Sequence, residues 1–417
     1  MMTQYIFATE SYPFTADLAS LLPLPPDEAI LLTKDVHRTL SEADRARFSR
    51  IVEVDGFDLD SLNAALTRIA PQRGARLVSH DDFFYEQFAQ VGPSHGVSVY
   101  TLESILPFVN KHVMKQRLKG SSVRLPRYRL FNAKAFASQG VGWLRQVADE
   151  LGYPMFTKPL QGAGAEGCTL IADEDQFLDW ARTCPVGTPY EIDEFIDGSV
   201  LYHCDSVLRC GRPIFTEVCR YSHPCADFAK GRMVGSYTLD ENDPWRESLA
   251  SAADQVFESF RRHHPVPDGV THMELFGTAS GEVIFLEVQF RPPGANVRRA
   301  YAERLGMNLE EMHYRLQMGL ECPSLVPRGM HAAWMYFPTA DGVVEAVEPL
   351  PELSSRVVEC TWGVMAGQRT RAPHSILDAR SRGVVALSLV IANDDNAHLR
   401  EDFERLCVHS PFRLARS

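Results

Sequence analysis

The sequence lacks the features that mark membrane-spanning, secreted and zinc-binding proteins. No run of about 18 apolar residues occurs in the 417 residues, so we expect no membrane partner. The first 22 residues carry no cationic start before an apolar core, and we therefore expect no signal peptide and a cytoplasmic location. The nine cysteines form no C-x-x-C pair and have no histidine at zinc-ligand spacing, which favours reduced thiols in the core.

Positive charge is also scarce. Lys and Arg total 42 against 54 Asp and Glu, which gives a formal net charge of -12. A molecule this acidic repels polyanions except at a local basic patch, so we expect no nucleic-acid partner. Hydrophobic residues make up 45% of the chain, the balance of an ordinary folded protein, and the length corresponds to about three structural units.

Apolar runs and helical periodicity divide the chain into three expected units. In residues 1–100 short strands alternate with helices, which predicts a small parallel α/β sheet without the glycine-rich turn of a dinucleotide-binding domain. Residues 101–195 are expected to hold one helix over 101–119 and then a lid of strands and helices. Residues 196–417 are expected to form a mixed α+β unit with a β-rich extension from about residue 330.

A glycine-rich loop is the first motif that carries chemistry. Gly162, Gly164 and Gly167 form a G-x-G-x-x-G pattern, but the residues on both sides read as strands, so the loop is expected at the tip of a β-hairpin. Because glycine adopts positive φ and has no side chain, the backbone N–H groups of such a loop can close over phosphates. Lys158 on the incoming strand is placed to reach a phosphate beneath it. The alternative is an ordinary flexible loop beside a surface lysine.

Two carboxylates on a second predicted hairpin form the next motif. In residues 270–291, Glu274 is expected opposite or diagonal to Glu287. Alternation predicts that the odd-numbered residues of the second strand share one face, including Gln289 and Arg291. Facing carboxylates repel each other unless a magnesium ion lies between them, and Arg291 would add a bidentate donor for a phosphate or carboxylate. The alternative is a solvated edge strand with a surface ion pair.

Further segments give weaker signals. Residues 190–198 fit a strand whose backbone and carboxylates could read an adenine edge, although the pattern by itself favours a plain half-buried strand that ends at a glycine turn. Candidates for a substrate pocket after another predicted strand are Arg220, Tyr221 and His223. Four nearby cysteines are expected to pack in the core: Cys204, Cys210, Cys219 and Cys225.

In this order and spacing, the segments resemble the ATP-grasp superfamily, in particular its carboxylate–amine ligases, which include L-amino-acid ligases. The likeness covers roughly residues 100–300. It rests on the Tyr-Pro-x-x-x-Lys158-Pro segment with its glycine loop, the segment from Asp193 to Gly198, His272-Met-Glu274, and Glu287-x-x-x-Arg291. The resemblance implies an α/β (α+β) fold of three parts: a Rossmann-like pre-ATP-grasp domain, a central lid and a C-terminal metal-bearing domain.

The resemblance also implies a role for each matching residue. ATP would be bound by Lys111, Lys158, Gly162, Gly164, Gly167, Asp193, Glu194 and Ile196. Magnesium, or manganese in its place, would be ligated by Glu274, Glu287 and Gln289. Arg291 and Lys158 would stabilise the phosphoryl group during its transfer.

Three departures from the family pattern bear on these roles. Asn110-Lys111 replaces a common Asp-Lys pair, which leaves Lys115 as a competing ATP contact. Gln289 stands where many relatives carry Asn. The usual ribose-binding acid is missing near Val200, and His203 or Asp205 is a candidate substitute.

The resemblance implies an ATP-dependent ligase that forms an amide or peptide bond through an acyl phosphate and releases ADP and phosphate. Its partners would be a small-molecule carboxylate and amine, with amino acids expected, and a homodimer is compatible with the sequence. Two alternatives remain: an ATP-dependent carboxylase that uses bicarbonate, and a nucleotide-binding sensor or scaffold without turnover. Donor and acceptor cannot be named from the sequence, because specificity depends on pocket shape.

Overall fold

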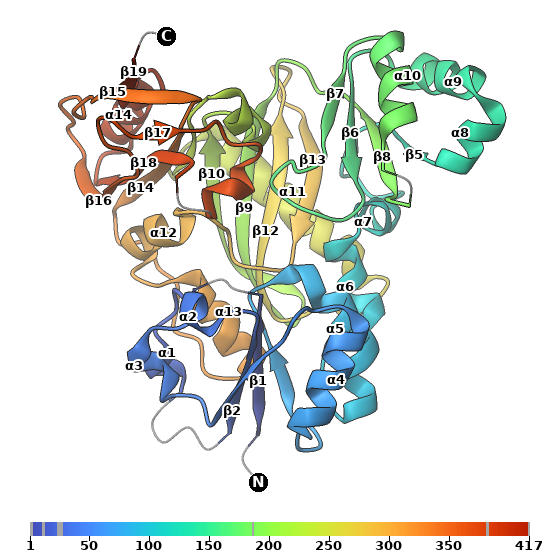
Figure 1. The fold of residues 1–417 in the computed structure, drawn as a ribbon, viewed down its shortest axis with the longest axis vertical. Coiled ribbons are helices and arrows are strands. Elements are labelled where there is room, and N and C mark those ends of the chain that lie inside the picture. Colours follow the sequence, from blue (N-terminus) through green and yellow to red (C-terminus); the bar gives the residue numbers. More distant parts are fainter. Residues whose placement is uncertain (1–2, 11–12, 23–27, 186, 381–382, 416–417) are drawn as a thin grey trace.

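The computed structural model describes residues 3–10, 13–22, 28–185, 187–380 and 383–415. Three parts are visible in the ribbon: a small sheet near the N-terminus, a protruding lid, and a large sheet with a C-terminal extension (Figure 1). In the part of the chain that is described, no helix is both long and apolar enough to span a membrane.

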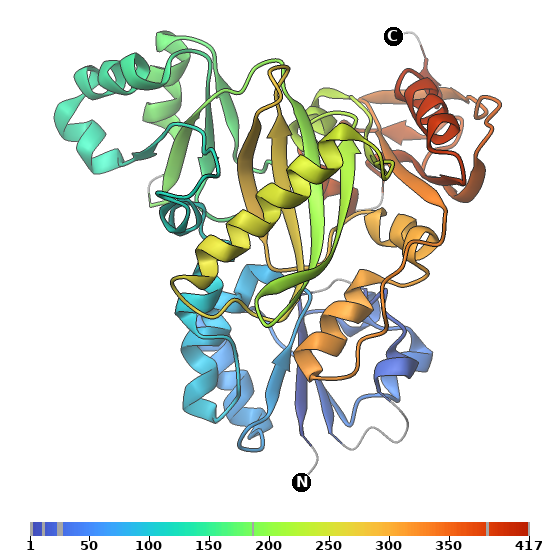
Figure 2. The same cartoon turned by 180° about the vertical axis from the view of Figure 1, so that it is seen from behind.

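The N-terminal part is a parallel sheet with helices on both faces, as predicted. Its strands lie in the order β3-β2-β1-β4, with bounds β3 (Arg50–Glu53), β2 (Ala29–Thr33), β1 (Tyr5–Thr9) and β4 (Arg76–Val78). One face packs on α4 (Leu59–Ile69), α5 (Tyr85–Val91) and the connector that follows. The short helices of the other face are α1 (Leu18–Leu21), α2 (Val36–Thr39) and α3 (Glu42–Arg45). They are joined there by α13 (Leu309–Met318), which comes from the far end of the sequence (Figure 2).

The connector consists of two helices rather than the single helix predicted over residues 101–119. These are α6 (Leu102–Val109) and α7 (Lys111–Arg117). Asn110 between them has an extended backbone, and its side chain accepts hydrogen bonds from the N–H groups of His112 and Val113. Asn110 therefore caps a new helix, which places Lys111 at the first position of α7.

The lid is a four-stranded antiparallel sheet. Its strands lie in the order β5 (Tyr128–Phe131), β8 (Tyr190–Glu194), β6 (Met155–Pro159) and β7 (Thr169–Ile171). The apolar core of the sheet is completed by α8 (Ala133–Gln139), α9 (Val141–Leu151) and α10 (Glu174–Thr183). The glycine-rich loop joins β6 to β7, so the predicted hairpin is confirmed.

An eight-stranded antiparallel sheet forms the largest part of the molecule. Its strands follow the order β13 (Val283–Gln289), β12 (Gly269–Gly277), β9 (Val200–Arg209), β10 (Arg212–Tyr221), β11 (Val234–Thr238), β14 (His331–Pro338), β18 (Val385–Asn393) and β16 (Arg356–Trp362). Its opposite faces are covered mainly by α11 (Pro244–Arg261) and α12 (Val297–Leu305). The extension adds β15 (Gly342–Val347), β17 (Arg369–Thr370), β19 (Phe412–Leu414), α14 (Asn396–Cys407) and the short 3-10 helix η4 (Ile376–Arg380). Another short 3-10 helix, η3 (Cys225–Lys230), lies between β10 and β11.

A β-bulge in β13 changes which residues share a face. Glu274 pairs with Glu287, but the next residue of β12, Leu275, pairs with Phe285, so β13 carries one extra residue. Phe285 therefore faces the core, whereas Leu286 lines a cavity with Glu287. The predicted strict alternation is wrong at this point.

The cysteines follow the prediction only in part. All nine are free, and Cys204 and Cys219 are buried. Cys225 is partly exposed, and Cys210 is exposed because it forms the tight turn between β9 and β10. Core packing was therefore wrongly expected for Cys210.

Candidate active site

A cavity of about 1040 Å³ lies where the three parts of the molecule meet. Its walls come from the loop after β4, from the lid hairpin, and from the cavity side of β12 and β13. Because the N-terminal strands are parallel, their carboxyl ends all point toward the large sheet, the usual location of ligand sites in such folds (Figure 1).

The lid contributes a buried lysine and the glycine loop. The Lys158 ammonium lies 2.9 Å from Asp193 Oδ2 and 3.2 Å from Glu191 Oε1. Burial alone would lower the pKa of Lys158, but these two carboxylates hold it above its usual value, so the side chain stays cationic. The loop lies over the cavity, and its Gly162 carbonyl accepts a hydrogen bond of 2.9 Å from Lys111.

The two lysines of α7 have different surroundings. Lys111 lines the cavity, and its Nζ lies 3.1 Å from Glu287 Oε2. Lys115 is completely buried and donates hydrogen bonds to Glu191 Oε1 (2.9 Å) and to both carboxylate oxygens of Asp193 (2.7 and 2.8 Å). Of the two, only Lys111 is therefore placed to meet a ligand in the cavity.

The segment predicted to lie along the adenine presents backbone rather than carboxylates. Asp193, Glu194 and Ile196 all line the cavity. The Asp193 carboxylate is held by Lys115 and Lys158, and that of Glu194 accepts hydrogen bonds from the backbone N–H (2.9 Å) and Nε (2.7 Å) of Arg127. With both carboxylates engaged, the backbone after β8 is what this segment can offer to a ligand.

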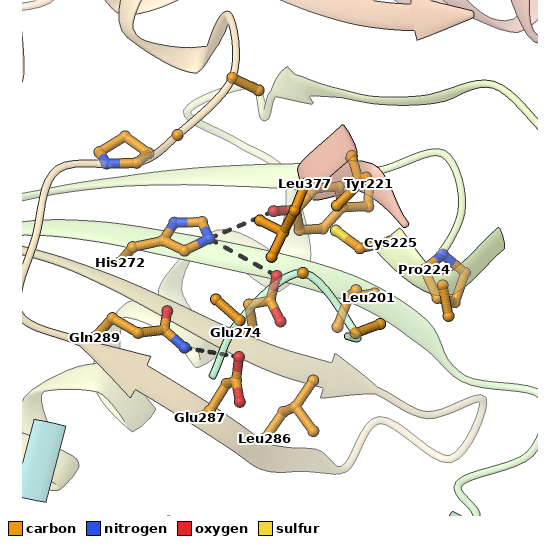
Figure 3. Close-up of a pocket in the computed structure, with 18 of the residues that line it drawn as sticks. Leu201, Tyr221, Pro224, Cys225, His272, Glu274, Leu286, Glu287, Gln289 and Leu377 are labelled. Carbon is orange, nitrogen blue, oxygen red and sulfur yellow. Dashed lines mark hydrogen bonds and ion pairs between the residues drawn. The ribbon is translucent and has the colours of Figure 1, made fainter. Parts of the chain in front are cut away.

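Glu274, Glu287 and Gln289 gather on the cavity side of the β12–β13 hairpin (Figure 3). Gln289 Nε2 donates to Glu287 Oε1 at 2.7 Å, and its own Oε1 is buried without a hydrogen-bond partner among the described residues. Burial would raise the pKa of Glu287, but Lys111 and Lys158 lower it to about 2. A magnesium ion prefers oxygen ligands. The carboxylates of Glu274 and Glu287 and the unpaired amide oxygen of Gln289 are such ligands, so these residues fit the metal.

Arg291 follows β13 and points toward the N-terminal part. Its Nε lies 3.5 Å from Asp82 Oδ2, and its Nη1 donates to the Pro292 carbonyl at 3.1 Å. Both Arg291 and Asp82 line the cavity. The guanidinium thus lines the same cavity as Glu274, Glu287 and Gln289 and retains donors for an anion.

Behind Glu274 lies a buried network of polar side chains. His272 Nδ1 is 2.6 Å from Asp205 Oδ1, and its Nε2 is 3.7 Å from Glu274 Oε1 (Figure 3). Burial would lower the pKa of His272, but Asp205 raises it to about 9. The other carboxylate oxygen of Asp205 contacts His203 Nδ1 at 2.7 Å and accepts a hydrogen bond from Tyr301. His203 and Asp205 are completely buried and do not line the cavity, so neither is available to a ribose.

Of the three predicted substrate-pocket residues, only Tyr221 lines the cavity. Arg220 precedes it on β10, and because side chains alternate along a strand, it lies on the opposite face of the sheet near Tyr237. His223 is turned away as well, since its Nδ1 contacts the Met233 carbonyl at 2.9 Å. The predictions for Arg220 and His223 are therefore wrong.

Comparison with known proteins agrees with this arrangement. No family model matches the sequence. The chain is 24% identical over 265 residues to the L-arginine-specific L-amino acid ligase of Bacillus subtilis, a match covering 62% of this chain and 61% of that protein. An L-amino acid ligase from Bacillus licheniformis superimposes with a TM-score of 0.72 at 14% identity, over 100% of this chain and 99% of that one. Carboxyaminoimidazole ribonucleotide synthase from Aspergillus clavatus, solved with ATP, gives a TM-score of 0.64 at 12% identity, over 97% of each chain.

The chain has the ATP-grasp fold. The prediction from the sequence is thereby confirmed at the level of the fold. The chain spans less than two thirds of the length of the L-arginine-specific ligase that it matches.

Two contributions to the cavity of this ATP-grasp fold were missed in the sequence. Asp81 and Asp82 follow β4, where polar residues after a buried parallel strand are a recognisable sign of a site. Leu377 of η4 also lines the cavity, and it packs against the glycine loop so closely that a Cβ on Gly164 would lie 2.6 Å from its Cγ. Nothing local in the sequence signals this second contact.

Proposed function

We propose that this protein joins a carboxylate to an amine at the expense of ATP. The observation that carries the proposal is the convergence of Lys111, Lys158, Arg291 and the Glu274–Glu287 pair on one cavity beneath a glycine-rich hairpin. Phosphoryl transfer depends on positioning and charge neutralisation more than on a nucleophilic side chain, and this cavity offers both.

The reaction has two steps. A carboxylate oxygen of the first substrate attacks the γ-phosphorus of ATP, the bond to the β–γ bridging oxygen breaks, and ADP leaves. The amine of the second substrate, after losing one proton from its ammonium form, then attacks the acyl carbon through its nitrogen. The carbon–oxygen bond to phosphate breaks, phosphate leaves, and the nitrogen loses a second proton to give the amide. Lys111 and Lys158 would hold the phosphates, and Arg291 would bind the anionic acyl phosphate.

Glu274, Glu287 and Gln289 would hold a divalent cation, magnesium or manganese. When bound, the metal supplies positive charge to the phosphate oxygens. The lowered pKa keeps Glu287 ionised over the physiological range, and the contact with Gln289 orients it. The glycine loop would exclude water from the phosphates, and the backbone at the end of β8 would bind the adenine.

Amino acids are the substrate class that we propose. The support comes from two similar proteins, both of which are named L-amino acid ligases.

Phosphate release tests the proposal. Wild-type protein with ATP and magnesium is supplied with the twenty L-amino acids singly and in pairs, and products are identified by mass spectrometry. We expect phosphate and an amide product for at least one combination, and a loss of at least about 100-fold in kcat for Glu287→Ala. Glu282→Ala, an exposed position in the turn of the same hairpin, should behave as wild type. Equal turnover by Glu287→Ala would contradict the metal assignment.

A carboxylase is the second candidate, because carboxyaminoimidazole ribonucleotide synthase shares the fold over 97% of the chain. The same assay separates the two functions. Phosphate release that requires bicarbonate, and that stops when bicarbonate is removed, would favour the carboxylase. Release in bicarbonate-free buffer with an amine present favours the ligase.

A further inference from the structure

Two adjacent aspartates lie at the carboxyl end of β4, on the wall of the cavity that faces Arg291. Asp81 and Asp82 are 2% and 8% exposed, and both line the cavity. Asp and Glu are rarely buried to this extent unless they are paired. The position of these two therefore calls for a partner.

The partners present in the protein are few. Asp81 accepts long hydrogen bonds from the N–H groups of Phe83 (3.3 Å) and Glu10 (3.4 Å). Asp82 Oδ2 lies 3.5 Å from Arg291 Nε, and Asp82 Oδ1 is buried without a hydrogen-bond partner among the described residues. One carboxylate oxygen is thus left for a ligand.

The energetic balance also favours an added cation. Burial raises the pKa of Asp82 despite the nearby Arg291 guanidinium, and burial together with repulsion from Asp82 raises the pKa of Asp81 to about 7. Two neighbouring buried carboxylates are under-compensated when the Arg291 guanidinium contacts only Asp82, at 3.5 Å, and Lys111 adds a weaker effect. A positive group entering from the cavity would relieve this cost.

We propose that Asp82, supported by Asp81, binds the primary ammonium group of a substrate. The proposal rests on the ligase function proposed above and adds to it the recognition of one substrate group. A divalent metal fits the site less well, because the Arg291 guanidinium already contacts Asp82 and would repel it. An ammonium carries a single charge and three donors, which match the free Oδ1 and the weakly bonded Asp81.

The position relative to the chemistry supports a substrate group. Lys111 and Glu287 are both close enough to influence the ionisation of Asp82. An ammonium held there would lie on the Arg291 side of the cavity, next to the proposed position of the acyl phosphate. The group is either the α-amino group of the carboxylate donor or the amine of the acceptor, and the two sources share this chemistry.

Isothermal titration calorimetry tests the subsite without turnover. Wild-type protein saturated with magnesium and a non-hydrolysable ATP analogue is titrated with each of the twenty L-amino acids, and then with the des-amino carboxylic acid of each binder. We expect the des-amino compound to bind at least tenfold more weakly. Asp82→Asn should weaken the amino acid at least tenfold while the affinity for the ATP analogue changes less than twofold. Asp60→Asn, exposed in the same part of the protein, is the matched control.

Stability provides the second readout. Because Asp82 is an under-compensated buried charge, the melting temperature of Asp82→Asn should equal or exceed that of wild type. Asp81→Asn, which keeps the carboxylate of Asp82, should weaken the amino acid less than Asp82→Asn does. A fall of several degrees for Asp82→Asn would indicate a structural role and overturn the proposal.

The remaining outcomes are also decisive. Three results would each overturn the proposed subsite. The wild-type protein could bind no amino acid, or it could bind the amino acid and its des-amino analogue with equal affinity. The affinity of Asp82→Asn for the amino acid could also lie within twofold of wild type. Binding that depends on Asp82 without any phosphate release would leave the subsite standing and refute the ligase function. Where turnover occurs, the substrate whose KM rises in Asp82→Asn identifies the donor or the acceptor as the source of the ammonium.

Discussion

Lys111 and Lys115 lie one turn apart on α7 and have different environments. Lys111 reaches the cavity, whereas Lys115 is enclosed by Glu191, Asp193 and the ring of Tyr128, whose centroid is 4.5 Å from its Nζ. Both appear in the sequence as lysines on a predicted helix, and spacing alone left the choice between them open. The choice is decided by the helix boundary at Asn110 and by the acids of β8 in the lid, which lie 76 and 78 residues from Lys115 in the sequence.

Removing Lys115 should destabilise the protein. In Lys115→Met the buried carboxylates of Glu191 and Asp193 would keep only Lys158 as a cation, and uncompensated buried charge typically costs about 3–5 kcal/mol. Urea denaturation should show this loss in the free energy of unfolding. Lys119→Met, at an exposed position just beyond α7, should change it by less than about 0.5 kcal/mol. A Lys115→Met variant as stable as wild type would refute the structural role.

At the scale of elements, the glycine loop is held between two partners. Lys111 at the start of α7 binds the Gly162 carbonyl, and its own backbone N–H donates to the Leu160 carbonyl at 2.9 Å. On the other side, Leu377 of η4 packs against Gly164, which has φ of 65°. The loop is thus positioned by the connector and by the C-terminal extension.

Gly164→Ala should weaken ATP binding. The new Cβ would clash with Leu377 and would force a left-handed backbone on alanine, which costs about 1 kcal/mol. We expect the KM for ATP to rise at least about fivefold. Leu377→Ala in the same protein should restore part of this loss by relieving the clash, while the backbone cost remains. An unchanged KM in Gly164→Ala would show that the loop does not close against η4.

The elements themselves were largely predictable, and their irregularities were not. Apolar patterning and turn residues predicted the β6–β7 and β12–β13 hairpins. The bulge that turns Leu286 into the cavity lies in the pairing of β13 with its hairpin partner β12, and the alternation of residues in the sequence does not indicate it. In the site, the closeness of Glu274 and Glu287 followed from a short turn, but the turn left open whether they pair directly or diagonally. Arg220 and His223 were misplaced because the sequence does not show which face of β10, or of the loop after it, meets the cavity.

At the scale of the whole molecule, α13 packs against the N-terminal sheet and so connects the C-terminal half of the chain to it. The buried Glu310 accepts hydrogen bonds from the N–H (2.9 Å) and hydroxyl (2.6 Å) of Thr15, and it forms an ion pair with Arg298 beside the cavity. Burial would raise the pKa of Glu310, but His80, the Arg298 guanidinium and the Thr15 hydrogen bonds lower it to about 2. Burial lowers the pKa of His80 itself to about 4, so His80 is charged only below that pH.

Acid should weaken the contacts of Glu310 with Thr15 and Arg298. Because the pKa of Glu310 falls from 4.5 to about 2 on folding, ionised Glu310 stabilises the folded protein above pH 4.5 by about 3 kcal/mol, and this contribution is lost as the pH falls from 4.5 to 2. Glu310→Gln should lower the free energy of unfolding at pH 7 by a similar amount and should depend less on pH in that window. Glu401→Gln, exposed on α14, should retain the wild-type pH dependence. Identical pH profiles for Glu310→Gln and wild type would contradict the assignment.

The charge of the cavity is mixed. The net charge of the molecule is -12, and the cavity is lined by many acidic side chains as well as by Lys111, Lys158 and Arg291. A few cations at one place suit a small polyanion such as ATP and not an extended one.

Oxygen transfer from the carboxylate to phosphate tests the central claim most directly. The protein is incubated with ATP, magnesium and amino acids whose carboxyl groups carry oxygen-18, and the released phosphate is analysed by mass spectrometry. An acyl phosphate predicts that each phosphate formed with amide product carries one labelled oxygen, because the carboxylate oxygen that attacked the γ-phosphorus leaves with it. Unlabelled phosphate accompanying amide product would contradict the account.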